Sequence, residues 1–133
     1  MVRQKKNVEE SVIEREVEPV AVEKATVEDR LRPIVGEIKK CDGVIGYILK
    51  NTESATIDLD DPTKLADYAT LSSLTFEATE KLSELFELGK VRVVKVEGND
   101  TKVLQLRIDE NDVSFFLEKS VDTRKILQKM NAP

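Results

Sequence analysis

The side chains that most often carry enzyme chemistry are scarce in this sequence. It has no histidine and a single cysteine, Cys41, so histidine-dependent acid–base catalysis is excluded and a Cys/His zinc site would lack ligands. Cys41 follows Lys39 and Lys40, whose charges favour a reactive thiolate, but an unreactive structural cysteine is the commoner case. We therefore predict no catalytic residue, metal site or cofactor. An enzyme that uses only carboxylates and lysines remains a third possibility.

Two short motifs resemble binding loops but lack their required residues. Asp58, Asp60 and Asp61 are spaced like calcium ligands, yet Pro62 stands at a ligand position and Ala69 replaces the final glutamate. Gly89-Lys90 lacks both the upstream glycine and the following Ser or Thr of a phosphate-binding loop. The aspartates are interpreted as helix-capping acids and Gly89 as a helix stop.

Composition limits the class of protein. The chain has 133 residues, 40% of them hydrophobic, which suits one globular domain. The net charge is −5 and no long basic run occurs, so nucleic acid is not an expected partner. No apolar stretch reaches the roughly 20 residues of a membrane span, and Met1 to Lys6 lead into glutamates instead of an apolar signal region. The sequence predicts a cytoplasmic protein without direct membrane insertion.

The chain divides into a charged extension and a folded body. Residues 1–25 are rich in charged side chains and Pro19 interrupts any helix, so we expect a mobile extension. As an alternative, Val8, Val12 and Ile13 share a helical face and would suit a segment that folds on a partner. The body is predicted to span residues 26–133.

The first half of the body predicts a helix and a hairpin. Thr26 can cap a helix, although Pro33 predicts that its regular part begins only around Arg32, and Asp42-Gly43 ends it. Residues 44–49 are continuously apolar and predict a central strand buried on both faces. Residues 55–59 alternate apolar and polar, which predicts a second strand whose apolar side chains share one buried face. These side chains are Ala55, Ile57 and Leu59.

The second half predicts a long helix, three strands and a last helix. Asp61-Pro62 is a strong helix start, and no breaker follows before Gly89. Strands are expected at residues 91–96, 103–108 and 113–117, with a last helix capped by Ser120. One side of the long helix is apolar over more area than a sheet face covers, so a second packing partner is implied. That side carries Leu71, Leu74, Ala78, Leu82, Leu85 and Leu88.

The order of elements predicts a single α+β domain with a five-stranded antiparallel sheet and all helices on one side of it. From about Leu31 to Met130, this order resembles the roadblock (dynein light-chain) domain. The opening strand Val44-Ile45-Gly46-Tyr47-Ile48-Leu49 is similar to that of the family, as is Glu87-Leu88-Gly89-Lys90 before Val91-Arg92-Val93-Val94. The chain departs from the family pattern at residues 51–54, where members commonly carry an acid and a glycine.

The resemblance implies a homodimer joined through the third-strand edges and the long helices, and a non-catalytic role in binding Ras-like small GTPases, in motor complexes or as a scaffold. The residues agree, because an exposed valine-rich edge would invite aggregation if it stayed unpaired. The predicted interface residues are Leu71, Leu74, Ala78, Val91, Val93, Val94 and Val96. Two alternatives remain. Residues 91–96 form an internal strand while the long helix meets the first or last helix, or the chain is a small-molecule sensor on a profilin-like sheet.

Overall fold

The structure is a computed structural model, and it describes residues 26–131. Its elements in chain order are α1 (Val27–Lys39), β2 (Val44–Lys50), β3 (Ala55–Leu59), the 3-10 turn η1 (Pro62–Lys64), α2 (Leu65–Phe86), β4 (Val93–Glu97), β5 (Thr101–Ile108), β6 (Asn111–Glu118) and α3 (Thr123–Asn131). The α+β class and the order of elements agree with the sequence prediction. The predicted extension at residues 1–25 lies outside the described residues.

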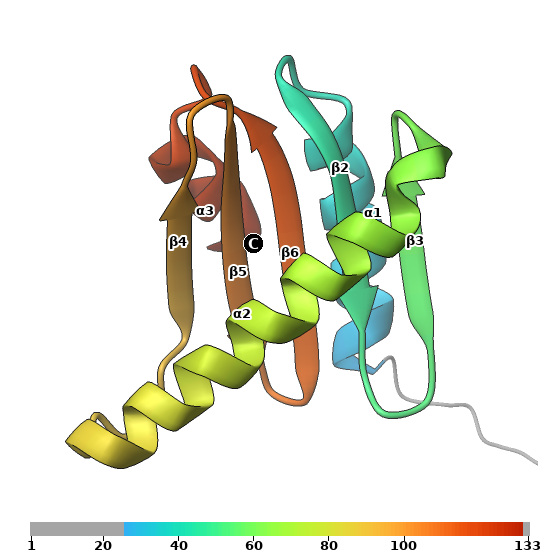
Figure 1. The fold of residues 1–133 in the computed structure, drawn as a ribbon. Coiled ribbons are helices and arrows are strands. Elements are labelled where there is room, and N and C mark those ends of the chain that lie inside the picture. Colours follow the sequence, from blue (N-terminus) through green and yellow to red (C-terminus); the bar gives the residue numbers. More distant parts are fainter. Residues whose placement is uncertain (1–25, 132–133) are drawn as a thin grey trace, which may run out of the picture.

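The five strands form one antiparallel sheet in the order β3-β2-β6-β5-β4 (Figure 1). β2 lies inside the sheet and most of its side chains are buried, as its continuous apolar run predicted. Among the strands between residues 26 and 131, β4 lies at an edge and pairs only with β5. The alternative of an internal strand at residues 91–96 is therefore wrong.

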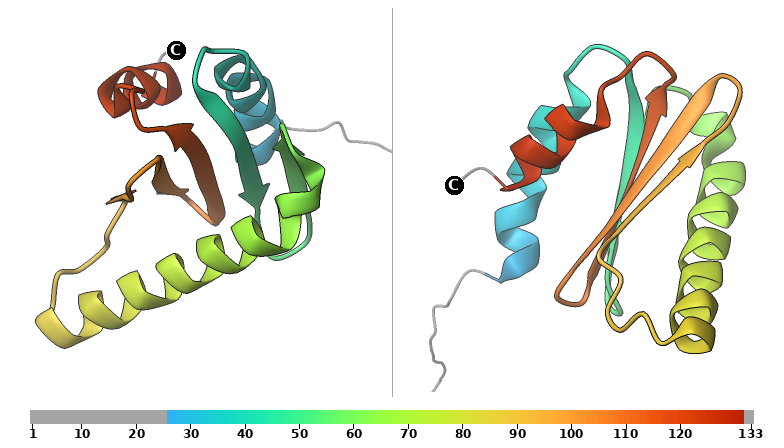
Figure 2. Two further views of the ribbon diagram at one scale, coloured as in Figure 1. Left: turned by 45° about the horizontal axis from the view of Figure 1, so that its top comes forward. Right: turned by 90° about the vertical axis from the view of Figure 1, so that its left-hand side faces the viewer.

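The helices lie on both faces of the sheet, which corrects the prediction that they share one side. α1 and α3 cover one face, and α2 crosses the other face alone (Figure 2). The face under α1 and α3 holds the larger core, in which Leu31, Val35 and Ile126 pack on strand residues such as Phe115 and Leu117. The core under α2 is smaller and centres on Ile48, Val103 and Phe116. α2 therefore does not meet α1 or α3.

The helices begin and end where local capping interactions occur, and their bounds differ from the sequence prediction at three points. Thr26 and Asp29 form a reciprocal capping box, and α1 runs regularly from Val27 through Pro33 instead of beginning near Arg32. α2 ends at Phe86, because Glu87 and not Gly89 adopts the left-handed cap. α3 begins at Thr123 and not directly after Ser120. The Asp122 carboxylate accepts a hydrogen bond from the Arg124 backbone N–H at 3.0 Å and so acts as the capping group.

The strands begin and end close to the predicted residues, with one correction in burial. β4 starts at Val93, so Val91 and Arg92 belong to the connection after α2. In β3, Leu59 is half-buried while Ala55 and Ile57 are exposed. The reason is that β3 lies at an edge of the sheet. α2 covers this strand only at Leu59, close to Tyr68 of the helix. The predicted alternation is present, but its apolar face is only partly covered.

Candidate functional site

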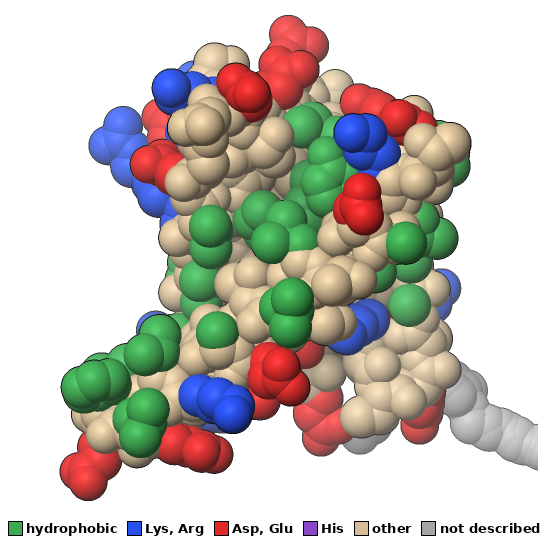
Figure 3. All heavy atoms as spheres, viewed as in Figure 1, with side chains coloured by type: hydrophobic (Ala, Val, Ile, Leu, Met, Phe, Trp, Pro, Cys, Tyr) green, Lys and Arg blue, Asp and Glu red, His purple; other side chains and the backbone are tan. Residues whose placement is uncertain are grey.

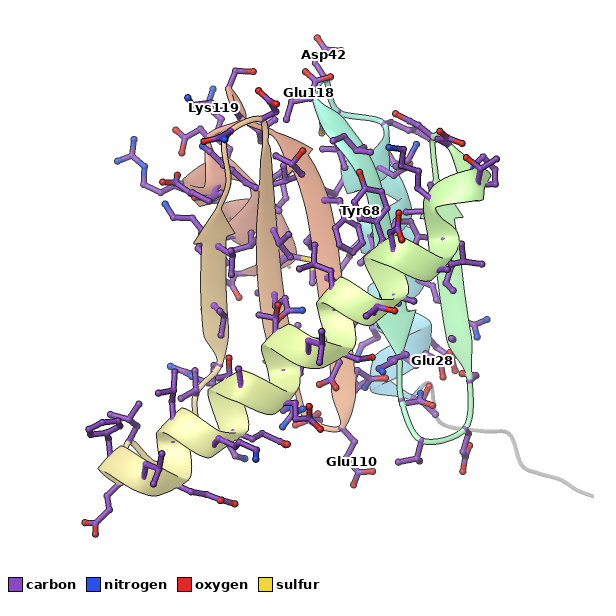
Figure 4. The ribbon with its side chains drawn as sticks, viewed as in Figure 1. Glu28, Asp42, Tyr68, Glu110, Glu118 and Lys119 are labelled. Carbon is purple, nitrogen blue, oxygen red and sulfur yellow. The ribbon has the colours of Figure 1, made fainter. Side chains whose placement is uncertain are left out.

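α2 is fixed to the sheet by a side that is small and polar rather than leucine-rich. Ser72 is the only fully buried residue of this helix. Near the start of the helix, Tyr68 stacks on Phe116 with ring centroids 4.4 Å apart, and Figure 4 shows Tyr68 between the helix and the sheet. Thr79 and Ser83 follow Ser72 at helical spacing and are half-buried. The side of α2 that faces the sheet therefore differs from the side that the leucines mark.

A buried polar cluster joins the middle of α2 to β5 and β6. Ser72 Oγ and Ser114 Oγ lie 2.6 Å apart, and Gln105 Nε2 donates to the Ser72 carbonyl oxygen at 3.0 Å and to Ser114 Oγ at 3.1 Å. Gln105 Oε1 is buried without a hydrogen-bond partner among the described residues. Polar contacts of this kind fix the position of a helix more than they add net stability.

Arg107 on β5 holds the neighbouring side of α2. Its guanidinium donates to Asp112 Oδ1 at 2.7 Å and to Glu80 Oε2 at 3.0 Å, and it lies 5.3 Å from the centre of the Phe76 ring. The hydrogen bond to Asp112 has the largest effect on the pKa of Arg107 and the one to Glu80 the next largest, and both raise this pKa further above its usual range. Lys50 also contacts this side of the helix, through Ser73. The acidic and polar side of α2 is thus turned toward the end of the sheet that holds Lys50 and Arg107.

The leucine side of α2 is left exposed by the other residues between 26 and 131. Leu74 is 57% exposed and Leu85 is 76% exposed, and Leu71, Ala78 and Leu82 are exposed with them. In Figure 1, α2 crosses the sheet diagonally and leaves the upper parts of β4 and β5 open. Figure 3 shows apolar side chains on this open part of the sheet and along α2 toward its end. Apolar side chains thus recur along this side of α2 and on the open part of the sheet, and we call this surface the apolar band.

The free edge of β4 borders this band. Val94 and Val96 pair with Gln105 and Val103, so their side chains lie on the α2 face, and Val96 is 39% exposed. Val93 pairs with Leu106 and is directed to the α1–α3 face, where it is 46% exposed. The other edge of β4 pairs with no described strand.

The predicted interface residues fall into two groups. The structure brings Leu71, Leu74, Ala78, Val94 and Val96 to one face of the sheet beside a free edge. We call this set the leucine–valine face.

The two remaining predicted residues lie elsewhere. Val93 faces the opposite side of the sheet, and Val91 is half-buried before the strand, near the end of α2. Leu82 and Leu85 continue the leucine–valine face but are missing from the predicted interface. The helical spacing that selected Leu74 and Ala78 would also have selected them.

The aspartates and the cysteine that resembled chemical motifs have structural contacts. Asp61 caps η1 by accepting from the Thr63 backbone N–H at 3.1 Å, and this contact, with that of the Thr63 hydroxyl, lowers the pKa of Asp61. Asp60 forms an ion pair with Lys39 at 2.7 Å. Cys41 is half-buried, with its Sγ 3.8 Å from the Glu37 carbonyl oxygen. Within residues 26–131, no group of three potential metal ligands occurs.

Comparison with known proteins identifies the fold. No protein-family model and no curated protein matches the sequence. Among solved structures, the chain is similar to a roadblock/LC7 domain from Streptomyces avermitilis, with a TM-score of 0.60 and 17% sequence identity. The match covers 71% of this chain and 82% of that domain. The chain therefore has the α+β fold of a roadblock/LC7 domain, with a five-stranded antiparallel sheet and three helices. None of the described helices is both long and apolar enough to cross a bilayer.

Proposed function

We propose that this protein is a non-catalytic adaptor that forms a homodimer through the leucine–valine face and the β4 edge, and that binds a protein partner. The observation that carries the proposal is the position of the exposed leucines of α2 beside an unpaired strand edge. A second copy that pairs its β4 antiparallel to this one would extend the sheet and place its own α2 over the exposed valines. The same contact would cover the exposed leucines and pair the free edge of β4, and both features would promote aggregation if they stayed exposed.

A Ras-like small GTPase is the partner class that we propose first. The fold supports this choice, because roadblock domains commonly bind or regulate such GTPases, and also act in motor complexes or as scaffolds. Ras-like GTPases switch by ordering surface loops around their bound nucleotide, so an adaptor can distinguish the two states by shape alone. A cytoplasmic location is part of the same proposal.

The proposal is tested by the solution mass of the purified full chain. Light scattering is expected to give twice the chain mass of 15.0 kDa. The mass should increase further when one small GTPase from the same cell is added, with one nucleotide state preferred. A monomer at all concentrations would refute the dimer, and a dimer that gains mass with no GTPase in either state would refute the proposed partner.

A small-molecule sensor is the second candidate, and one observation favours it. A cavity of about 340 Å³ lies between the end of α2 and the β4–β5 region, lined by Thr79, Ser83, Gln105 and Arg107 among others. Gln105 lies in the lining of this cavity, and its Oε1 is buried without a hydrogen-bond partner among the described residues, so a small shift of this side chain would let it accept from a donor group of a ligand. A small molecule that co-purifies with the protein and raises its melting temperature would favour this role.

A further inference from the structure

A second groove lies on the face of the sheet opposite to the leucine–valine face. It has a volume of about 690 Å³ and is lined by residues from the first half of α1, the end of α3, the beginning of β4 and the end of β5. Figure 2 shows how these helices and strands are arranged. Its floor is apolar and comprises Ile34, Leu106, Ile108, Leu127 and Met130. Val93, which is 46% exposed, forms part of its wall on the β4 side. The proposed dimer contact through α2 would not cover this floor.

The rim of the groove is mainly basic, with Asp109 as the one acid among its lining residues. Arg30 comes from α1, and Lys90 and Arg92 come from the connection that leads into β4. All three side chains are exposed, and none forms an ion pair with a residue between 26 and 131. Arg107 also borders the groove, but it is engaged by Asp112 and Glu80. An apolar floor with a basic rim fits an occupant that is both apolar and acidic.

We propose that this groove binds residues 8–18 of the same chain. This segment has five glutamates and a single arginine, and Val8, Val12, Ile13 and Val17 alternate with them. The acids match the basic rim, and the branched apolar side chains match the floor. A second copy of the folded body would present the same basic rim, and like charges would repel. Charge complementarity therefore selects the acidic segment over a second copy.

Residues 8–18 are joined to the folded body close to the groove, so a short connection is enough for them to reach it. The described chain begins at Thr26, next to Val27, which itself lines the groove. Residues 19–26 separate the segment from Val27 and reach about 30 Å when extended, enough to return to the groove. A short tether also gives an effective concentration on the order of millimolar, so a weak contact is occupied within one molecule. The proposal is independent of the dimer and of the GTPase.

The first test uses cleavage of the full chain by a glutamyl endopeptidase after Glu14 and Glu16. Arg30→Glu should speed this cleavage about fivefold, because it removes one attractive charge and adds a repulsive one beside the acidic segment. An acid is compatible with the first turns of α1, so the fold is retained, as circular dichroism will verify. Lys125→Glu is the matched control, since it makes the same charge change at an exposed position of α3 outside the groove. Its cleavage rate should equal that of the native chain.

The second test detects the contact directly by nuclear magnetic resonance of the ¹⁵N-labelled full chain. Serine replacement of Val8, Val12, Ile13 and Val17 should shift the amide signals of Ile34, Leu106 and Leu127, which line the groove away from the β4 edge, and leave that of Leu74 unchanged. Unchanged groove signals, or equal cleavage of the native chain and the Arg30→Glu variant, would overturn the proposal. Groove signals that move with protein concentration rather than with the replacement would assign the groove to a second copy, which also overturns it.

Discussion

Leu74 offers the sharpest test of the proposed dimer. It lies at the centre of the leucine–valine face and is 57% exposed in the single chain. Full burial of a leucine contributes ~1.5 to 3 kcal/mol, so covering its exposed part contributes about 0.9 to 1.7 kcal/mol in each subunit. A symmetric contact counts twice, and Leu74→Glu should therefore raise the dimer dissociation constant about 20- to 300-fold. Desolvation of the new carboxylate adds to this loss.

Sedimentation equilibrium over a range of concentrations measures this constant, and a urea titration of the dilute monomer measures its own stability. Leu74→Glu should lower the stability of the monomer less than that of the dimer, because more than half of the side chain is already exposed in one chain. Ser73→Glu is the matched control, since it adds the same charge one residue away, on the side of α2 that contacts Lys50. A native dissociation constant for Leu74→Glu in a folded chain would show that the contact lies elsewhere.

Three further outcomes follow from the described contacts. Val96→Lys should weaken the dimer at least tenfold in sedimentation, since it places a charge on the face beside the β4 edge, and an unaffected dimer would exclude that edge. Arg107→Met leaves Asp112 without its partner and should lower the free energy of unfolding by about 1 to 2 kcal/mol, measured with urea. The pKa of Glu28 lies below its ordinary value of 4.5, first because Arg32 donates a hydrogen bond to it. Its contribution to stability is present above pH 4.5 and is lost as the pH falls through the lowered pKa, so Glu28→Gln should flatten the acid limb of a stability–pH curve. An equally steep limb in that variant would contradict the assignment.

Local signals predicted the elements well, because each depends on only a few neighbouring residues. Asp61-Pro62 marks the beginning of the η1–α2 segment, and Thr26 caps α1, because hydrogen bonds to the first backbone N–H groups are satisfied within one turn. The continuous apolar run of β2 correctly indicated a strand inside the sheet. Pro33 was given too much weight, since packing of α1 on the sheet outweighs the cost of one missing hydrogen bond.

The layer arrangement was predicted wrongly, although the sequence held a clue to it. A central strand buried on both faces requires cover on both faces of the sheet, which excludes helices on one side only. The leucines of α2 were taken as its core-facing side, whereas Ser72, Thr79 and Tyr68 face the sheet. Hydrophobic periodicity identifies an apolar side but not what covers it. The groove beside α1 and α3 was also missed, because its residues come from segments far apart in the sequence.

The two faces of the sheet differ in how completely one chain covers them, and this difference connects the proposals. The α1–α3 face has an extensive core of its own, so its groove can exchange an acidic segment without loss of the fold. The α2 face has a small core and an apolar helix side turned away from it, which residues 26–131 leave exposed and which the proposed dimer would cover. We therefore expect an obligate contact on the α2 face and a reversible contact on the α1–α3 face. A partner that competes for the groove would therefore displace residues 8–18 without separating the dimer.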